Sequence, residues 1–212
     1  KEQNLIIKVE KVYTSDDIYS KEISLIENIS LSEAKTNLSW EMSGLNYQNF
    51  LGNIYLSGID NIFLKKKIGK NKFSLSRIIS SPLMLKNNII LADDNGTIFN
   101  INLNGKINWK KNIYKKIYKK VYKNLIFSIY KNNIFVADNI GFVYAIDFES
   151  GKLIWIKNHG IPLKSNIKIF DNKIFLINQD NRILCLNTSD GSKIWDIRSI
   201  SSFIKSQNLL SL

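Results

Sequence analysis

The chain has 212 residues, of which 44% are apolar, so it is long enough to bury the core of one sizeable domain. Its net charge of +12 raises the question of nucleic-acid binding, but arginine, the residue best suited to reading bases, occurs only at Arg77, Arg182 and Arg198. The most frequent residues, Ile, Asn and Lys, are encoded by A- and T-rich codons, so the base composition of the genome explains much of the lysine excess. We therefore predict no nucleic-acid partner.

The chain begins with a stretch, residues 1–36, that shows no repeat and is interpreted as an N-terminal extension or linker. The first tryptophan lies in the stretch Asn37–Gly44 (NLSWEMSG), and a second stretch, Asn61–Gly69 (NIFLKKKIG), follows it.

Three segments that share one pattern then follow, at about residues 80–112, 124–158 and 166–199. Each has two turn positions held by residue types that tolerate a left-handed backbone, and each closes on a tryptophan. The shared positions are Gly96, Gly141 and Asn181 in the first turn, Gly105, Gly151 and Gly191 in the second, and the closing Trp109, Trp155 and Trp195.

Each segment reads as four short strands rich in Ile, Phe, Val and Tyr. In the second copy these strands are predicted at about 125–130, 134–138, 142–148 and 152–157. Four antiparallel strands every 40 or so residues predict an all-β fold, a partial β-propeller with about three full blades within a propeller portion of residues 37–212. A β-sandwich with chance resemblance between its hairpins is the alternative.

The closing tryptophans suit the junctions between blades, because an indole offers a large flat ring and an N–H that pairs with a backbone carbonyl. A blade is apolar on both faces and needs neighbours to stack against. We therefore predict a structural, blade-docking role for one set of residues: Trp109, Trp155, Trp195, Gly105, Gly151 and Gly191.

Between the first two blades lies an unusual stretch, residues 110–123, in which Ile or Val and Tyr recur every fourth residue among lysines. On a helix this pattern makes an apolar-aromatic stripe flanked by Lys115, Lys116, Lys119 and Lys120, which favours contact with an anionic surface such as a membrane. The alternative is a solvated connector whose Ile and Tyr side chains pack on blade edges.

No catalytic, cofactor-binding or metal-binding residues are predicted. The only histidine, His159, has no accompanying nucleophile pattern, and the only cysteine, Cys185, has apolar neighbours that predict a buried thiol. The acidic residues of the repeats, Asp138, Asp147 and Asp190, fall at turns, where a carboxylate usually caps its own backbone. No apolar run is long enough to span a bilayer.

The segment 145–155 (AIDFESGKLIW) resembles the pyrroloquinoline-quinone-type propeller repeat, which typically reads Ala-x-Asp-x-x-x-Gly-x-x-x-Trp. In that repeat the tryptophan docks onto an adjacent blade. The third copy has Cys185 and Asn187 at the Ala and Asp positions, and the first copy has Asn100 and Asn102.

The stretches 37–44 and 61–69 are similar to the opening region of a lipoprotein family of the outer-membrane β-barrel assembly machinery, BamB, as found in alphaproteobacteria. That family has eight blades in a ring, and the resemblance, over about residues 37–212, implies that the strand near 61–68 closes the last blade. Because the chain supplies about three and a half blades, we expect it to be a fragment of a longer protein.

The resemblance implies a non-catalytic scaffold in the periplasm, associated with the outer membrane. The implied partners are the central barrel subunit of the machinery and unfolded outer-membrane proteins, with no cofactor and no small-molecule substrate. Two alternatives stay open: a propeller related to the quinone-dependent dehydrogenases, and a general protein-interaction or sensor propeller.

Overall fold

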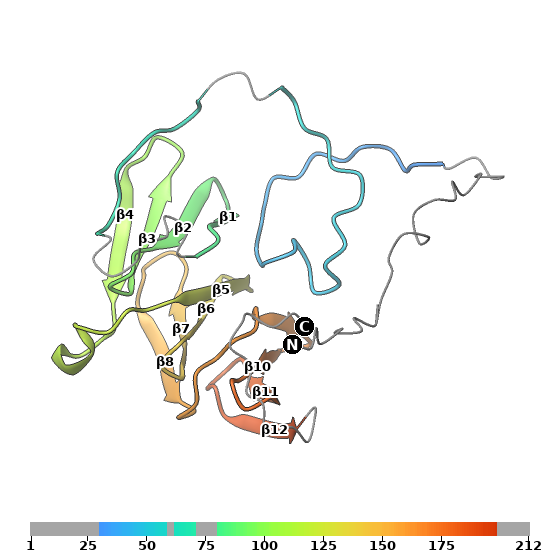
Figure 1. Ribbon diagram of the computed structural model, residues 1–212. Helices are drawn as coiled ribbons and strands as arrows, with labels where there is room; N and C mark the ends of the chain where they lie inside the picture. The colour runs from blue at the N-terminus through green and yellow to red at the C-terminus, as the bar shows by residue number, and fades with distance from the viewer. Residues whose placement is uncertain (1–29, 59–61, 71–79, 199–212) are drawn as a thin grey trace, which may run out of the picture. The chain divides into compact units, whose positions relative to one another are not determined.

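The computed structural model describes residues 30–58, 62–70 and 80–198 (Figure 1). Contacts divide the chain into two units, Lys1–Ser32 and Glu33–Leu212, and the strands of the described residues all belong to the second. Most of the predicted N-terminal extension lies outside the described residues. Within the described ranges, no helix is long and apolar enough to cross a membrane.

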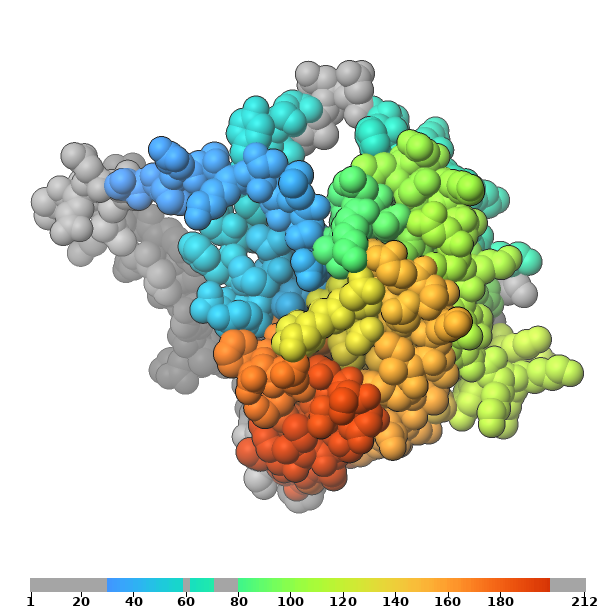
Figure 2. All heavy atoms as spheres, turned by 180° about the vertical axis from the view of Figure 1, so that it is seen from behind, coloured from blue at the N-terminus to red at the C-terminus, as the bar shows by residue number. Residues whose placement is uncertain are grey.

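The described residues of the second unit form three four-stranded antiparallel sheets, in the orders β1-β2-β3-β4, β5-β6-β7-β8 and β9-β10-β11-β12. The predicted all-β propeller fold is therefore confirmed. Figure 2 shows the three sheets following one another, from green through yellow and orange to red. The strands are β1 (Leu83–Leu85), β2 (Asn88–Ala92), β3 (Thr97–Asn102), β4 (Ile107–Asn112), β5 (Leu125–Tyr130), β6 (Asn133–Asp138), β7 (Phe142–Asp147), β8 (Leu153–Asn158), β9 (Lys168–Phe170), β10 (Lys173–Ile177), β11 (Arg182–Asn187) and β12 (Lys193–Arg198).

The first hairpin of each sheet has a two-residue turn in which both residues have a positive φ. This backbone matches a type I′ turn, whose twist follows the twist of the strands it joins. Asn tolerates the left-handed region better than most residues, which explains why it holds the second position each time. The turn pairs are Lys86 and Asn87, Lys131 and Asn132, and Asp171 and Asn172, with φ between 47° and 63°.

The middle sheet is apolar on both faces because successive side chains of a strand point to opposite sides. In β6, Ile134 and Val136 belong to the core shared with the first sheet. Their neighbours Phe135 and Ala137 belong to the core shared with the third sheet. All four side chains are buried, so each sheet completes the core of the next.

The outer pair of strands carries the same irregularity in every sheet. The residue opposite each closing tryptophan is small or short, and the register shifts immediately after it, which marks a β-bulge. A short side chain there leaves room on the sheet face for the indole ring. The facing pairs are Asn100 with Trp109, Ala145 with Trp155, and Cys185 with Trp195.

A segment before the sheets crosses their innermost strands. Trp40 exchanges two backbone hydrogen bonds with Met84 of β1, at 2.7 and 2.9 Å. The N–H of Ile129 in β5 donates to the carbonyl oxygen of Glu41 at 2.6 Å. The edges of β1 and β5 thus gain backbone partners from residues far away in the sequence.

The same segment is tied to the third sheet by Lys168 of β9, which is only 5% exposed. Its ammonium group donates to the carbonyl oxygens of Ser43 and Asn46 at 2.8 and 2.9 Å, and to Oδ1 of Asn49 at 2.6 Å. Three oxygen acceptors therefore surround this buried charge, as burial of a cation requires.

The structure differs from the sequence prediction at residues 61–68. Residues 62–68 are described, and no strand is assigned to them. A β-strand requires a hydrogen-bonded neighbour strand, and none of the described residues pairs with this stretch in that way.

Candidate functional site

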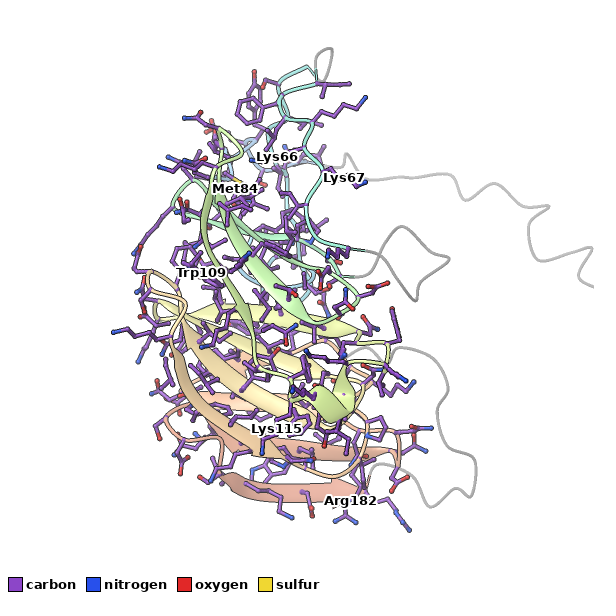
Figure 3. The ribbon with its side chains drawn as sticks, turned by 90° about the vertical axis from the view of Figure 1, so that its left-hand side faces the viewer. Lys66, Lys67, Met84, Trp109, Lys115 and Arg182 are labelled. Atoms are coloured by element: carbon purple, nitrogen blue, oxygen red, sulfur yellow. The ribbon has the colours of Figure 1, made fainter. Side chains whose placement is uncertain are left out.

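The first junction between blades is formed by Trp109 of β4. Its indole N–H donates to the carbonyl oxygen of Phe148 in the second sheet at 2.9 Å. A Cβ at Gly151 would lie 2.6 Å from Cδ2 of this ring, so only glycine fits against it. Figure 3 shows Trp109 between the first and second sheets.

The second junction repeats this arrangement one blade further along the chain. The indole N–H of Trp155 donates to the carbonyl oxygen of Thr188 at 2.9 Å, and its ring lies against Gly191. The third tryptophan, Trp195, is 38% exposed and packs on Phe175 of its own sheet, with ring centroids 6.1 Å apart. The structure thus joins two of the three predicted tryptophans to a glycine of the following blade.

The third predicted glycine, Gly105, has a different neighbour. A Cβ there would lie 3.0 Å from Cδ1 of Leu64, and the ammonium group of Lys66 donates to the carbonyl oxygen of Gly105. Leu64 therefore contacts the first blade at the position where Trp109 and Trp155 contact the second and third. This contact places residues 62–68 beside the turn between β3 and β4.

The connector, residues 113–124, does not form the amphipathic helix on which the lysine stripe depended. After β4 ends at Asn112, the connector contains a single 3₁₀ turn, Lys116–Tyr118. Ile113 and Tyr114 pack against the first core, whereas Ile117 is 78% exposed. The apolar residues of the pattern are therefore divided between the core and the solvent.

The predicted anionic-contact residues lie on this connector. All four side chains are exposed, and Figure 3 shows Lys115 beside the short 3₁₀ turn. Whether they contact an anionic surface stays a prediction. The residues are Lys115, Lys116, Lys119 and Lys120.

A buried polar cluster fixes the connector to the second blade. The hydroxyl of Tyr114 donates to Oδ2 of Asp138 at 2.5 Å, while Oδ1 of Asp138 accepts the backbone N–H groups of Gly141 and Phe142 at 2.8 Å each. Burial raises the pKa of both the Tyr114 phenol and the Asp138 carboxyl group. The Asp138 carboxylate thus accepts hydrogen bonds both from its own turn and from the connector.

Lys123 closes this cluster and is 1% exposed. Its ammonium group donates to the carbonyl oxygen of Tyr118 and lies 5.2 Å from the centre of the Tyr114 ring. Burial lowers the pKa of Lys123, while the nearby carboxylates of Asp93, Asp94 and Asp138 oppose that shift. Its charge is therefore compensated inside the fold.

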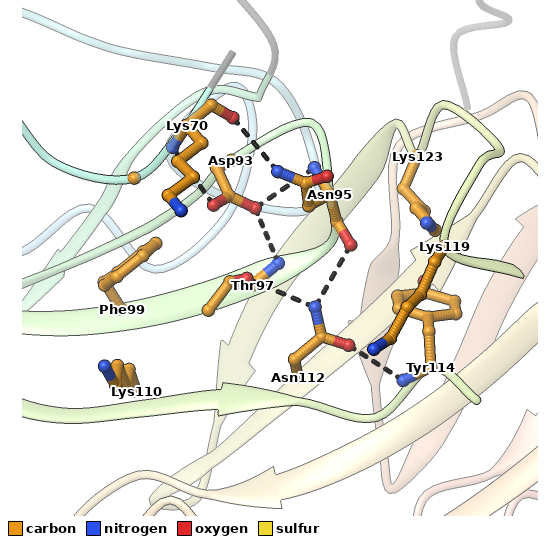
Figure 4. Close-up of a pocket in the computed structure, with 11 residues that line it drawn as sticks. Lys70, Asp93, Asn95, Thr97, Phe99, Lys110, Asn112, Tyr114, Lys119 and Lys123 are labelled. Carbon is orange, nitrogen blue, oxygen red and sulfur yellow. Dashed lines mark hydrogen bonds between the residues drawn. The ribbon is translucent and has the colours of Figure 1, made fainter. Parts of the chain in front are cut away.

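An open cavity of about 780 Å³ lies beside this cluster (Figure 4). Lys70, Lys110, Lys119 and Lys123 line it, together with the rings of Phe99 and Tyr114. The sequence pattern pointed to Lys119 alone among these four lysines. Lys110 and Lys123 are the end residues of the stretch 110–123 but were not among its predicted contact residues, because the helical stripe did not include them. Lys70 was missed because it lies in another segment, which no local spacing connects to this stretch.

The acidic residues of the turns behave as the sequence predicts. Oδ1 of Asp147 accepts the backbone N–H of Ser150 at 2.7 Å, and Oδ1 of Asp190 accepts that of Ser192 at 3.0 Å. Within the described ranges, no group of three or more His, Cys, Asp or Glu side chains is placed to hold a metal ion.

The histidine and the cysteine that the sequence singles out show no sign of a reactive site. His159 is in the loop after β8, where burial lowers the pKa of its imidazole. Cys185 is fully buried in β11, and burial raises the pKa of its thiol, so it has the character of a core residue.

The sequence profile of one protein family, described as "Outer membrane protein assembly factor BamB", matches residues 64–203 of the chain. A search of curated proteins finds no match.

Among solved structures, the chain is similar to BamB from Moraxella catarrhalis, with 15% identity and a TM-score of 0.49, covering 59% of this chain and 36% of that one. It is also similar to the quinohemoprotein alcohol dehydrogenase from Comamonas testosteroni, with 12% identity and a TM-score of 0.55, covering 77% and 27%. The computationally designed Ika4 protein has 13% identity and a TM-score of 0.51, with 66% and 83% covered. At such identities the similarity shows the fold alone, and the chain spans little more than a third of that BamB.

Proposed function

Because the chain belongs to the family of the outer membrane protein assembly factor BamB, we propose that it acts as a non-catalytic scaffold in the assembly of outer-membrane β-barrel proteins. The observation that carries the proposal is the family match over residues 64–203, which includes all three sheets. The proposed location is the periplasm, at the outer membrane. The proposed partners are the central barrel subunit of the assembly machinery and unfolded outer-membrane proteins.

The outermost strands offer surfaces that suit this role. The outer edges of β4, β8 and β12 have no neighbouring strand among the described residues, so an extended polypeptide has backbone groups to pair with. Apolar side chains next to these edges are exposed and suit the alternating pattern of a membrane β-strand. They are Leu153, Ile154 and Ile156 on β8, and Ile194, Trp195 and Ile197 on β12.

The test for the first partner is co-purification of a tagged chain with the central barrel subunit under native detergent conditions. We expect both proteins in the eluate and the chain in the outer-membrane fraction of the cell. A chain that purifies alone would contradict the scaffold role.

The test for the second partner uses a urea-unfolded, fluorescently labelled outer-membrane protein that is diluted into the chain. Ile154 and Ile194 each precede a closing tryptophan and are both 48% exposed, so the variant I154K/I194K removes apolar surface at two equivalent positions. The matched control N108K places a lysine at the equivalent position of the first blade, where no apolar side chain is lost. We expect weaker binding for the double variant only.

The alternative of a quinone-dependent dehydrogenase makes a different prediction. Addition of pyrroloquinoline quinone with Ca²⁺ would then change the absorbance of the quinone, whereas the scaffold leaves it unchanged. The hydrogen bonds of Asp138, Asp147 and Asp190 to their own turns support the scaffold, because these carboxylate oxygens already have donors.

A further inference from the structure

The positive charge of the chain is concentrated in one region. Residues 61–124, which contain the first blade and the connector, hold 15 Lys or Arg but only two acidic residues, Asp93 and Asp94. Residues 125–198, which contain the other two blades, hold nine Lys or Arg and seven Asp or Glu. A codon preference for lysine acts on the whole chain, so it does not explain why acidic side chains are so rare in one region.

The cavity brings together lysines from three separate segments of this region. Lys70 follows the stretch beside Gly105, Lys110 is on β4, and Lys119 is on the connector (Figure 4). All three side chains are exposed, and the four ion pairs among the described residues involve other cations. Ammonium groups that share a cavity without a carboxylate partner repel one another, and a bound anion relieves this repulsion.

The single carboxylate that lines the cavity, Asp93, forms no ion pair with these lysines among the described residues. Oδ1 of Asp93 accepts the backbone N–H groups of Asn95 and Thr97 at 3.1 and 2.8 Å, and Oδ2 accepts the backbone N–H of Lys70 at 3.2 Å. Both oxygens of Asp93 therefore accept hydrogen bonds from backbone N–H groups. The fourth lysine, Lys123, is compensated by the buried cluster, which leaves three ammonium groups for a ligand.

We propose that this cavity is a binding site for a phosphate ester. Lys70, Lys110 and Lys119 supply the positive charge, because the lysine ammonium group is a compact point charge that suits phosphate oxygens. The rings of Phe99 and Tyr114 provide apolar wall for the carbon part of the ligand, a combination typical of small-molecule sites of this volume. The inference is independent of the scaffold role, since neither the barrel subunit nor an unfolded client enters it.

A phosphate ester reaches such a site either as a free molecule or as the headgroup of an anionic lipid. Two assays on the full chain separate these sources. Isothermal titration with glycerol 3-phosphate measures the free ester. Co-sedimentation with phosphatidylcholine vesicles, with and without phosphatidylglycerol, measures the lipid.

The test variant K70Q/K110Q/K119Q removes the three cavity charges, and the matched control K106Q/K152Q/K157Q removes three charges from exposed positions outside the cavity. We expect the test variant to bind at least about tenfold more weakly, which corresponds to about 1.4 kcal/mol, while the control variant binds like the original chain. A third variant, K70R/K110R/K119R, keeps the charge and is expected to retain binding. All substituted side chains are exposed, and thermal melting checks that each variant is folded.

Selective loss in the titration supports the site with a free ester as ligand, and selective loss only with phosphatidylglycerol vesicles supports the site with a lipid headgroup. Equal weakening of the test and control variants would instead indicate diffuse attraction to a basic surface and would overturn the proposal. Absence of binding in both assays would overturn it as well.

Discussion

The indole N–H of Trp155 donates to the carbonyl oxygen of Thr188 at 2.9 Å, and so joins the outermost strand of the second sheet to the turn after β11 in the third. Trp109 and Phe148 make the same contact one blade earlier, also at 2.9 Å. The first two repeats thus place the same hydrogen bond, from an indole N–H to a backbone carbonyl, between neighbouring sheets.

We predict that this contact makes Trp155 far more important for stability than Trp195. The substitution Trp155→Ala removes a ring packed between two sheets and leaves a carbonyl oxygen without its donor, so the free energy of unfolding should fall by about 3 kcal/mol. Trp195→Ala removes a ring that is 38% exposed, and we expect a loss of about 1 kcal/mol. Urea denaturation measures both, and equal losses would contradict the docking role.

The glycines opposite the tryptophans allow a second comparison. Gly151 has a φ of +68°, and a Cβ there would lie 2.6 Å from the Trp109 ring. Gly160 has a φ of +76° with nothing within 4 Å of its Cβ position. Gly160→Ala therefore carries the backbone cost alone, about 1 kcal/mol, whereas Gly151→Ala should cost about 1–3 kcal/mol more in denaturation experiments. Similar values for the two would show that the ring moves aside freely.

Burial of Tyr144 predicts a loss of stability at alkaline pH. Burial raises the pKa of this phenol in the folded state, so above pH 10 the unfolded chain releases a proton that the folded chain retains. The free energy of unfolding should then fall by about 1.4 kcal/mol per pH unit for each such tyrosine. Denaturation between pH 9 and 11 should show a shallower decline for Tyr144→Phe, in which Tyr114, Tyr122 and Cys185, whose pKa values burial also raises, still contribute.

The lowered pKa values of Lys123 and Lys168 contribute equally to the original chain and to Tyr144→Phe. The difference between the two proteins therefore reports on Tyr144 together with Tyr114, whose pKa Tyr144 also raises. Identical pH dependence in both would contradict a raised pKa at Tyr144.

Lys168 is predicted to hold the segment that crosses the inner strands. Lys168→Met removes the donor to three oxygens around residues 43–49, and we expect a loss of about 2 kcal/mol together with faster amide hydrogen exchange in that segment. Lys173→Met, on the neighbouring strand, removes only a partly exposed pairing with Asp171 and serves as the control. Unchanged exchange in Lys168→Met would contradict this role.

The blades were predictable because their signals are local. A hairpin turn at Lys131 and Asn132 depends on a backbone conformation that its own residues favour, and apolar strands depend on adjacent residues. The connector was less predictable, since the fourfold spacing of its Ile and Tyr residues suits a helix. In the structure Tyr114 instead contacts Asp138 of the second blade and packs on the first core. Local spacing does not reveal these partners.

The sequence by itself determined the repeated four-stranded unit, its turns and the tryptophan that ends it. Only the tertiary structure decided which glycine meets each tryptophan, and that Leu64 takes the corresponding place at Gly105. It alone placed Lys70 and Lys119, 49 residues apart in the chain, around one cavity. The physical reason is that turns and strand patterns follow from neighbouring residues, whereas the side chains that share a surface depend on how whole sheets stack.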